Sequence, residues 1–294
     1  MSLPAARTGR ARERVLTMRG IAKRFGAVRA LTDVDFWVNE GEVVALIGDN
    51  GAGKSTLVKV LSGVHAPDSG TIEYDGDAVE ITSPADAQEL GIATVFQDLA
   101  LCDNLDVVAN LWLGRELRSG RTLDEVDMEQ QTWTLLRELS AKIPSVRTPV
   151  ASLSGGQRQT VAIARSLIGD PRVVILDEPT AALGVAQTAE VLNLIERLRE
   201  RGHGVVLISH SMADVMAVAD RVVVLRLGRN NGVYNIADVT SATLIAAITG
   251  ATDNAVTRRA ADRPDAEPAP EGEIIRMTDK SGRRKRNAPG GGGA

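Results

Sequence analysis

The spacing of apolar and polar positions distinguishes several kinds of segment along the chain. Between Val15 and Ile81, stretches alternate apolar with polar or amphipathic positions, as half-buried antiparallel strands do. One of these stretches carries Val34, Phe36 and Val38 on one face. Another alternates on both sides of Asp75-Gly76, a dipeptide that favours tight turns, and therefore predicts a hairpin. We expect an antiparallel β part near the start of the chain.

Other short segments are apolar throughout, apart from Thr94 in one of them. They lie at residues 43–47, 92–96, 173–176, 205–208 and 222–225. Continuous apolar strands are covered on both faces, as in parallel sheets flanked by helices, so these runs predict an α/β fold with a mainly parallel sheet. Near the end, Asn231-Gly232 predicts a hairpin turn, and the spacing of Leu244, Ile245 and Ile248 predicts one closing helix.

The stretch from Leu99 to about Ser140 has a helical pattern instead. Val107, Val108, Leu111 and Trp112 share one helical face, and a second helix is expected from Met128 to Leu139. We interpret residues 98 to about 150 as a helical subdomain inserted into the α/β core.

The two ends of the chain differ from the domain expected at residues 15–250. Residues 1–14 hold several arginines without an apolar stretch, and predict a disordered arm rather than a secretory signal. From about residue 251 the composition shifts to Ala, Pro, Arg, Asp and Gly, which predicts a disordered tail over 251–294. Its basic cluster at 283–286 could touch anionic lipid or nucleic acid, although such runs are more typical of solvated tails.

Composition narrows the class of protein. The chain has 294 residues, of which 44% are hydrophobic and 24% charged, as in globular domains. It has no apolar run near the roughly 20 residues that span a bilayer. Cys102 is its one cysteine, which excludes an internal disulfide and fits a reducing compartment. The net charge of −4 argues against general nucleic-acid binding.

A glycine-rich segment carries the strongest chemical signal. It follows the apolar run 43–47, precedes a helical pattern, and consists of Gly48, Asp49, Asn50, Gly51, Ala52, Gly53, Lys54, Ser55 and Thr56. Glycines let backbone N–H groups surround phosphate oxygens, Lys54 adds a charge for the β- and γ-phosphates, and the Ser55 hydroxyl can bind Mg²⁺. A chance match is the alternative, but the strand before it and the helix after it make a phosphate-binding loop the better interpretation.

Polar residues also follow three other apolar runs. Gln97 follows 92–96, Asp177 and Glu178 follow 173–176, and His210 follows 205–208. Because parallel strands place their carboxyl ends along one edge, these side chains should meet around one nucleotide. Asp177 and Gln97 could hold Mg²⁺, Glu178 could deprotonate water, and His210 could stabilise the γ-phosphate. Individually, a histidine or glutamine at a strand end is more often structural.

A final motif identifies a family. Ser154, Gly155, Gly156 and Gln157 open a helical pattern, and could form either an anion-binding turn or a plain serine cap. In combination with the phosphate loop, Gln97, residues 173–178 and His210, in that order, the motif resembles those of ABC transporter ATP-binding subunits. The resemblance covers about residues 15–250. It implies an α/β ATPase core with a helical subdomain, ATP and Mg²⁺ as ligands, and Phe25 stacked on adenine.

The resemblance also implies an assembly. Two such subunits, here a homodimer, would pair head to tail so that Ser154, Gly155 and Gly156 of one close over the ATP held by Lys54 of the other. The subunit would dock on membrane permease subunits through residues 98 to about 150, at the cytoplasmic face of the inner membrane, and act indirectly with a sugar-binding protein. Gly184 stands where most members of the family have an aspartate that contacts the other subunit.

Finer motifs, including Gly48-Asp49-Asn50-Gly51 and residues 110–116, resemble the ATPases of ribose-, xylose- and fructose-type importers. These residues imply import of a monosaccharide. An exporter subunit, or an importer for another substrate class, shares every catalytic motif and is the main alternative. A soluble relative that works on ribosomes or DNA would usually carry two ATPase domains on one chain.

Overall fold

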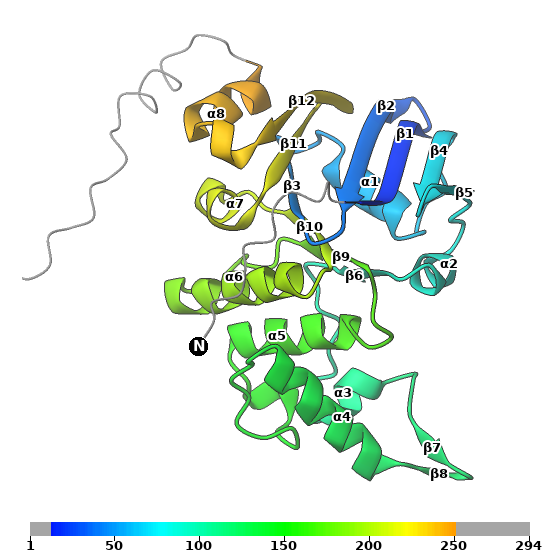
Figure 1. The fold of residues 1–294 in the computed structure, drawn as a ribbon, viewed down its shortest axis with the longest axis vertical. Helices are drawn as coiled ribbons and strands as arrows, with labels where there is room; N and C mark the ends of the chain where they lie inside the picture. Colours follow the sequence, from blue (N-terminus) through cyan, green and yellow to red (C-terminus); the bar gives the residue numbers. More distant parts are fainter. Residues whose placement is uncertain (1–12, 251–294) are drawn as a thin grey trace, which may run out of the picture.

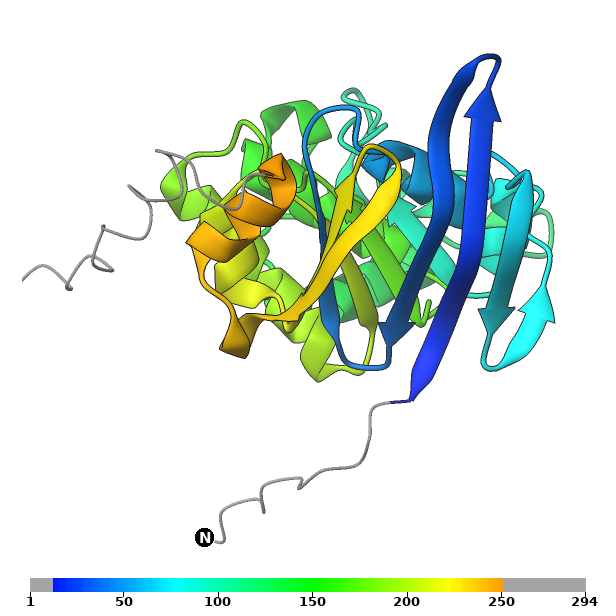
Figure 2. The same ribbon diagram turned by 90° about the horizontal axis from the view of Figure 1, so that it is seen from above.

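The computed structural model describes residues 13–250. Most of the arm expected at 1–14 and the whole tail expected at 251–294 lie outside the described residues. Figure 1 shows the described part as a layered sheet-and-helix body with a helical lobe below it, and Figure 2 shows the same body from above. None of its helices is both long enough and apolar enough to cross a membrane.

The central sheet of the described residues has six strands in the order β12-β11-β3-β10-β9-β6. Their bounds are β3 Val43–Ile47, β6 Ile92–Val95, β9 Val173–Asp177, β10 Gly204–Ile208, β11 Arg221–Arg226 and β12 Arg229–Asn235. Every neighbouring pair is parallel except β11 and β12. The continuous apolar runs therefore form the mainly parallel sheet that the sequence predicts.

A second, antiparallel sheet packs against the first, with the order β2-β1-β4-β5. It contains β1 Arg14–Phe25, β2 Val28–Asn39, β4 Ser69–Tyr74 and β5 Asp77–Val79. The turn between β4 and β5 is the expected Asp75-Gly76, and both residues have positive φ. The combination confirms the predicted α/β fold with an antiparallel β part.

Alternate residues of each central strand enter two different cores. Val44 and Leu46 of β3 pack with the antiparallel sheet and α1 (Lys54–Leu61). Val43, Ala45 and Ile47 pack on the other side, in the core that includes the helices. This two-sided burial explains why the central parallel strands contain continuous apolar runs.

Most helices cover the face of the central sheet away from the antiparallel sheet (Figure 1). They are α5 Gly155–Ser166, α6 Val185–Glu200, α7 Met212–Val218 and the closing helix α8 Ser241–Thr249. The short α2, Pro84–Glu89, begins at a Ser83 capping box beside the other core. Single 3₁₀ turns occur at η1 Val150–Ser152 and η2 Ile236–Asp238.

The lobe below the sheets contains α3 Val107–Trp112 and α4 Glu125–Glu138. The expectation of helix from Leu99 to about Ser140 is wrong between these helices, where β7 Arg118–Ser119 and β8 Thr122–Leu123 form a small hairpin. The hairpin turns at Gly120, whose φ is +66°, and its strand residues are exposed, so no core contact favours a helix there.

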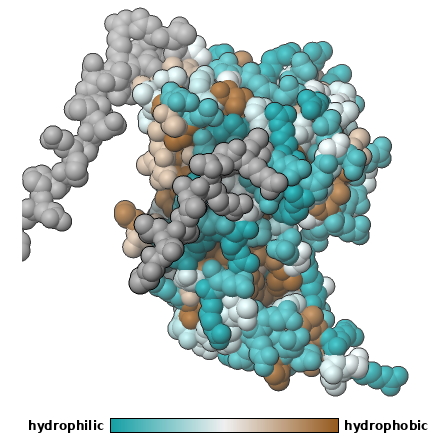
Figure 3. All heavy atoms as spheres, viewed as in Figure 1, coloured by the Kyte–Doolittle hydropathy of each residue, from teal (hydrophilic) through white to brown (hydrophobic). Residues whose placement is uncertain are grey.

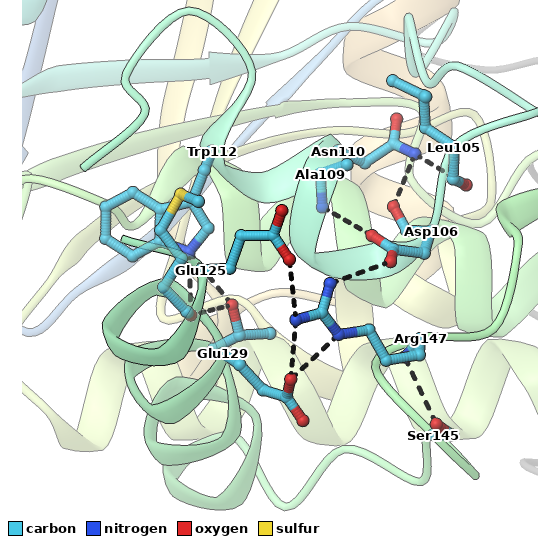
Figure 4. A network of polar contacts seen from close by, with 11 residues as sticks. Leu105, Asp106, Ala109, Asn110, Trp112, Glu125, Glu129, Ser145 and Arg147 are labelled. Atoms are coloured by element: carbon cyan, nitrogen blue, oxygen red, sulfur yellow. Dashed lines mark hydrogen bonds and ion pairs between the residues drawn. The ribbon is translucent and has the colours of Figure 1, made fainter. Parts of the chain in front are cut away.

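Polar contacts hold the lobe together (Figure 4). Trp112 donates from Nε1 to the Met128 carbonyl at 3.1 Å and to Thr132 Oγ1 at 3.0 Å, which joins α3 to α4. Arg147 pairs with Glu129 at 2.8 Å and also contacts Asp106 and Glu125. Hydrogen bonds and ion pairs between side chains of the lobe therefore hold its helices together.

The hairpin turn predicted at Asn231-Gly232 is also wrong. The chain turns at Leu227-Gly228, and Asn231-Gly232 lies within β12. A Cβ at Gly228 would lie 2.7 Å from the Ala30 carbonyl oxygen, so this close approach to β2 requires glycine. Tertiary packing on β2 overrides the local turn signal.

Candidate functional site

The polar residues predicted to meet do follow adjacent strands at one edge of the central sheet. Ile208 is paired with both Leu46 of β3 and Asp177 of β9, so the phosphate loop, Glu178 and His210 leave the sheet side by side. Gln97 follows β6, the next strand beyond β9, and is exposed. One edge thus gathers the candidate residues from four strands.

The phosphate loop depends on close backbone packing. A Cβ at Gly48 would lie 2.3 Å from the Leu225 carbonyl oxygen, and one at Gly53 would lie 2.8 Å from the Ala30 carbonyl oxygen. Gly51 has open space around it and a φ of +79°. Glycine is thus required by packing at the two ends of the loop and by conformation in the middle.

Lys54 lies within the loop that it follows. Its side chain is buried, and its Nζ donates to the carbonyl oxygens of Gly48 at 2.7 Å and Asp49 at 3.0 Å. Burial lowers the pKa of Lys54, although the carboxylates of Glu178, Asp49 and Asp177 oppose that shift. These two hydrogen bonds hold the Lys54 ammonium at the phosphate loop. Ser55, which is exposed, and Thr56, which is half-buried, follow it at the start of α1.

Glu178 and His210 form a pair across adjacent strands. His210 Nε2 lies 3.1 Å from Glu178 Oε1, and the His210 backbone N–H donates to Oε2 at 3.4 Å. The Glu178 N–H donates to the Ile208 carbonyl at 3.0 Å, which fixes its backbone with a φ of +52°. A non-glycine residue in this region requires support from its surroundings.

Both carboxyl groups beside Lys54 are perturbed by burial. Burial raises the pKa of Asp177, and the charge of Lys54 acts in the opposite direction. Burial also raises the pKa of Glu178, opposed first by His210. A carboxylate with a raised pKa next to a histidine is a proton acceptor suited to general-base chemistry.

A brace that the sequence did not reveal supports this pair. The Thr180 hydroxyl, two residues after Glu178, donates to Asp214 Oδ2 at 2.7 Å, and Asp214 lies in α7, just after His210. These residues are 34 positions apart in the chain, and no sequence pattern pairs them. Only the fold brings them together.

Ser154, Gly155 and Gly156, called the Ser154 loop below, form the start of α5, which Ser154 caps. Ser154 Oγ accepts from the Gln157 N–H at 3.3 Å, and Gln157 Oε1 accepts from the Ser154 N–H at 2.9 Å. A Cβ at Gly155 would lie 3.0 Å from Leu183, and one at Gly156 would lie 3.1 Å from Gln187. Ser154 and Gly155 are exposed at the N-terminus of this helix, where the remaining backbone N–H groups are suited to an anion.

Phe25 lies at the end of β1, and 43% of it is exposed. Its ring centroid is 5.2 Å from that of His65 in an edge-on arrangement, and the Lys23 ammonium lies 5.8 Å from the same centroid. The exposed ring is therefore held in place and open to a planar ligand.

Comparisons with known proteins identify the family of the chain. The sequence profile of the family described as ABC transporter matches residues 31–181. The fructose import ATP-binding protein FrcA of Rhizobium meliloti is 47% identical over 249 residues, which cover 82% of this chain and 96% of that protein. The xylose/arabinose import ATP-binding protein XylG of Sulfolobus acidocaldarius is 45% identical over 215 residues, covering 73% and 86% respectively.

Solved structures of ATP-binding cassettes have the same fold. A crystal structure of the ADP conformation of an ATP-binding cassette from an ABC transporter superposes with a TM-score of 0.70 and 25% identity, over 81% of this chain and 99% of that one. Phosphate loop, strand-end carboxylates and capped Ser154 loop are thus found on a shared fold and within a shared sequence family. The chain belongs to the ABC transporter family, as one of its ATP-binding proteins.

Proposed function

We propose that this protein hydrolyses ATP to power the import of a monosaccharide through an ABC transporter. The observation that carries the hydrolytic part is the Glu178–His210 pair, with its 3.1 Å contact, beside the buried Lys54. The import of sugar is supported by relatives at 47% and 45% identity that are named for fructose and for xylose/arabinose import.

Each residue at the sheet edge has a task in this proposal. The backbone of residues 48–56 and the Lys54 ammonium bind the phosphates, and Phe25 stacks on adenine. Glu178 takes a proton from the attacking water, which its raised pKa favours. His210 holds the γ-phosphate and stabilises its developing charge.

The oxygen donors fit a hard divalent cation. Asp177 is a half-buried carboxylate and Ser55 an exposed hydroxyl, while Gln97 offers an amide oxygen at the same edge. These side chains would hold Mg²⁺, which supplies positive charge to the phosphate oxygens. Gln97 also orients the water.

A second subunit completes the pocket. Ser154, Gly155, Gly156 and Gln157 of one chain cap the triphosphate on the other, in a homodimer. The exposed helix N-terminus described above supports this proposal, because its N–H groups are suited to the γ-phosphate. ATP binding closes the pair and hydrolysis releases it, since ATP favours whichever state it binds more tightly.

A membrane permease is the proposed partner at the cytoplasmic face of the membrane. A hollow of about 630 Å³ lies between α2, β6, α3 and α5, and includes Leu99, Leu111 and Phe96. Figure 3 shows apolar surface exposed between the sheet layers above and the helical lobe below. A permease segment seated there would be adjacent to Gln97. A sugar-binding protein acts indirectly, through the permease, and selects the sugar.

Reconstitution tests the proposal. The protein is incorporated into vesicles with its permease, and ATP hydrolysis is measured with a binding protein loaded with fructose, xylose or ribose. We expect one loaded binding protein to stimulate hydrolysis and sugar uptake. Hydrolysis that none of the three sugars stimulates would refute sugar import, whereas no hydrolysis in any condition would refute the ATPase assignment itself.

A further inference from the structure

An arginine that the proposed mechanism does not use connects two parts of the site. Arg165 lies in the last turn of α5 and extends to the segment that follows Gln97. Its Nη1 donates to the carbonyl oxygen of Ala100 at 2.8 Å, and its Nη2 donates to that of Leu99 at 2.6 Å. One guanidinium therefore clamps two successive peptide groups, which lie two and three residues after Gln97.

The clamped segment adopts a backbone that needs such support. Ala100 has a φ of +48°, a region that L-residues other than Asn and Asp seldom adopt. The Ala100 N–H donates to Asp98 Oδ1 at 3.1 Å, so the turn is closed on one side by its own side chain and on the other by Arg165. The conformation after Gln97 is thus imposed from α5.

The environment of Arg165 shows that the clamp is partly withdrawn from water. Burial lowers the pKa of this guanidinium, with Cys102 opposing the shift and nearby Arg115 adding to it. Its two hydrogen bonds go to backbone carbonyls, and charge-assisted bonds of this kind are stronger than neutral ones. The side chain also borders the hollow beside β6.

The other end of the same helix carries the Ser154 loop. α5 runs from Gly155 to Ser166 without interruption, so Ser154 and Arg165 are separated by roughly 16 Å of regular helix. Val161, Ile163 and Ala164 are fully buried along its length. Because such a packed helix moves as one body, any shift of the segment after Gln97 is passed on to the Ser154 loop.

We propose that Arg165 is a positioning residue that couples the position of Gln97 to the position of the Ser154 loop, so that the two move together. The inference rests on the proposed function, in which Gln97 serves the ATP of its own chain and Ser154 serves the ATP of the partner. Arg165 touches neither ATP. It holds Gln97 in the position that catalysis needs, and it couples the ATP pocket on one chain to the ATP pocket on the other.

Steady-state ATP hydrolysis by the full chain tests the proposal, with nucleotide affinity measured separately by equilibrium binding. Arg165→Gln removes the charged clamp, and we expect kcat to fall about tenfold, as a displaced positioning group does, while ATP affinity stays within about twofold. Arg165→Lys retains the charge and a donor, and should recover at least about a third of the lost kcat.

A double variant separates a positioning role from a merely structural one. If Arg165 acts through Gln97, then adding Arg165→Gln to a Gln97→Ala protein should lower kcat by less than about twofold, because the two changes remove one function. Multiplication of the two separate effects would overturn the proposal. So would an Arg165→Gln protein with more than half of the wild-type kcat.

Arg147→Gln is the matched control. Arg147 also braces the helical lobe, through Glu129, Asp106 and Glu125 (Figure 4). Among the described residues, its hydrogen bonds and ion pairs do not include the segment after Gln97. The Arg147→Gln variant should have lower thermal stability and a kcat within about twofold of wild type. An equal loss of kcat in Arg147→Gln and Arg165→Gln would refute a specific role for Arg165.

If Arg165→Gln fails to fold, Arg165→Lys and its double variant with Gln97→Ala provide the test. Wild-type protein that does not hydrolyse ATP would refute the proposed function instead.

Discussion

The Glu178→Gln substitution gives the sharpest test of the proposed chemistry. Glutamine has almost the volume of glutamate, and its carbonyl oxygen can still accept from the His210 N–H, which lies 3.4 Å from Glu178 Oε2. The change therefore removes the ability to accept a proton and the negative charge beside Lys54 and His210, with almost no change of volume. Because a positioned general base contributes about 10²–10⁴-fold, we expect kcat to fall by that factor.

Nucleotide binding should persist in the same variant, because Lys54 and the phosphate loop are unchanged. Steady-state hydrolysis and equilibrium titration with ATP measure the two properties separately. We expect ATP affinity within about twofold of wild type and accumulation of closed dimer. Hydrolysis within about threefold of wild type would refute Glu178 as the base.

The raised pKa of Glu178 adds a second readout, the dependence of stability on pH. Burial raises this pKa above its ordinary value of 4.5, so the native state binds the proton more tightly than the unfolded state does. The carboxyl group thus favours folding below its unfolded pKa, and this advantage is lost as pH rises through the folded pKa. Above that value the buried carboxylate destabilises the native state.

Glutamine carries no charge at any pH. The stability of Glu178→Gln relative to wild type should therefore increase as pH rises from about 4 to 8, measured by urea unfolding at each pH. A constant difference across that range, or a variant that becomes relatively less stable at neutral pH, would contradict the burial argument. The kcat of wild type should fall as pH drops through the same folded pKa, because the base is then protonated.

Three further predictions follow from other contacts. Lys54→Ala should abolish ATP binding in a calorimetric titration, since the buried ammonium is the cation within the phosphate loop, and wild-type affinity would refute its role. Glu42→Ala should cost about 3–5 kcal/mol of unfolding free energy, because it leaves Arg221, now 2.7 Å from Glu42 and 6% exposed, as an unpaired buried charge. Replacing both partners by methionine should cost far less in the same urea titration. Gly228→Ala should destabilise by at least about 1 kcal/mol, because its Cβ would meet the Ala30 carbonyl oxygen at 2.7 Å, and an unchanged melting temperature would refute that clash.

Much of the fold could be predicted from the order of residues. The strands β3, β9 and β10 contain the continuous apolar runs 43–47, 173–176 and 205–208, and two-sided burial leaves such runs few alternatives. The strand, glycine-rich turn and helix around Lys54 were equally predictable, because the glycines, Lys54 and Ser55 stand at the spacing of a phosphate-binding loop. The capped helix beginning after Ser154 follows from a capping box written within four residues.

Other features depended on contacts between distant segments. Asn231-Gly232 is a good local turn signal, yet the turn formed at Leu227-Gly228, where the chain meets β2. The hairpin at 118–123 replaced expected helix because it has no core to pack against.

The site shows the same division. The sequence determined which side chains end the strands, and the parallel sheet aligned them, because parallel strands place their carboxyl ends along one edge. Only the tertiary structure decided that Glu178 is desolvated beside His210, that Thr180 reaches Asp214, and that Arg165 clamps the segment after Gln97. Local patterns encode backbone conformation and burial, whereas pKa values and long-range hydrogen bonds arise from which distant groups share the same small volume.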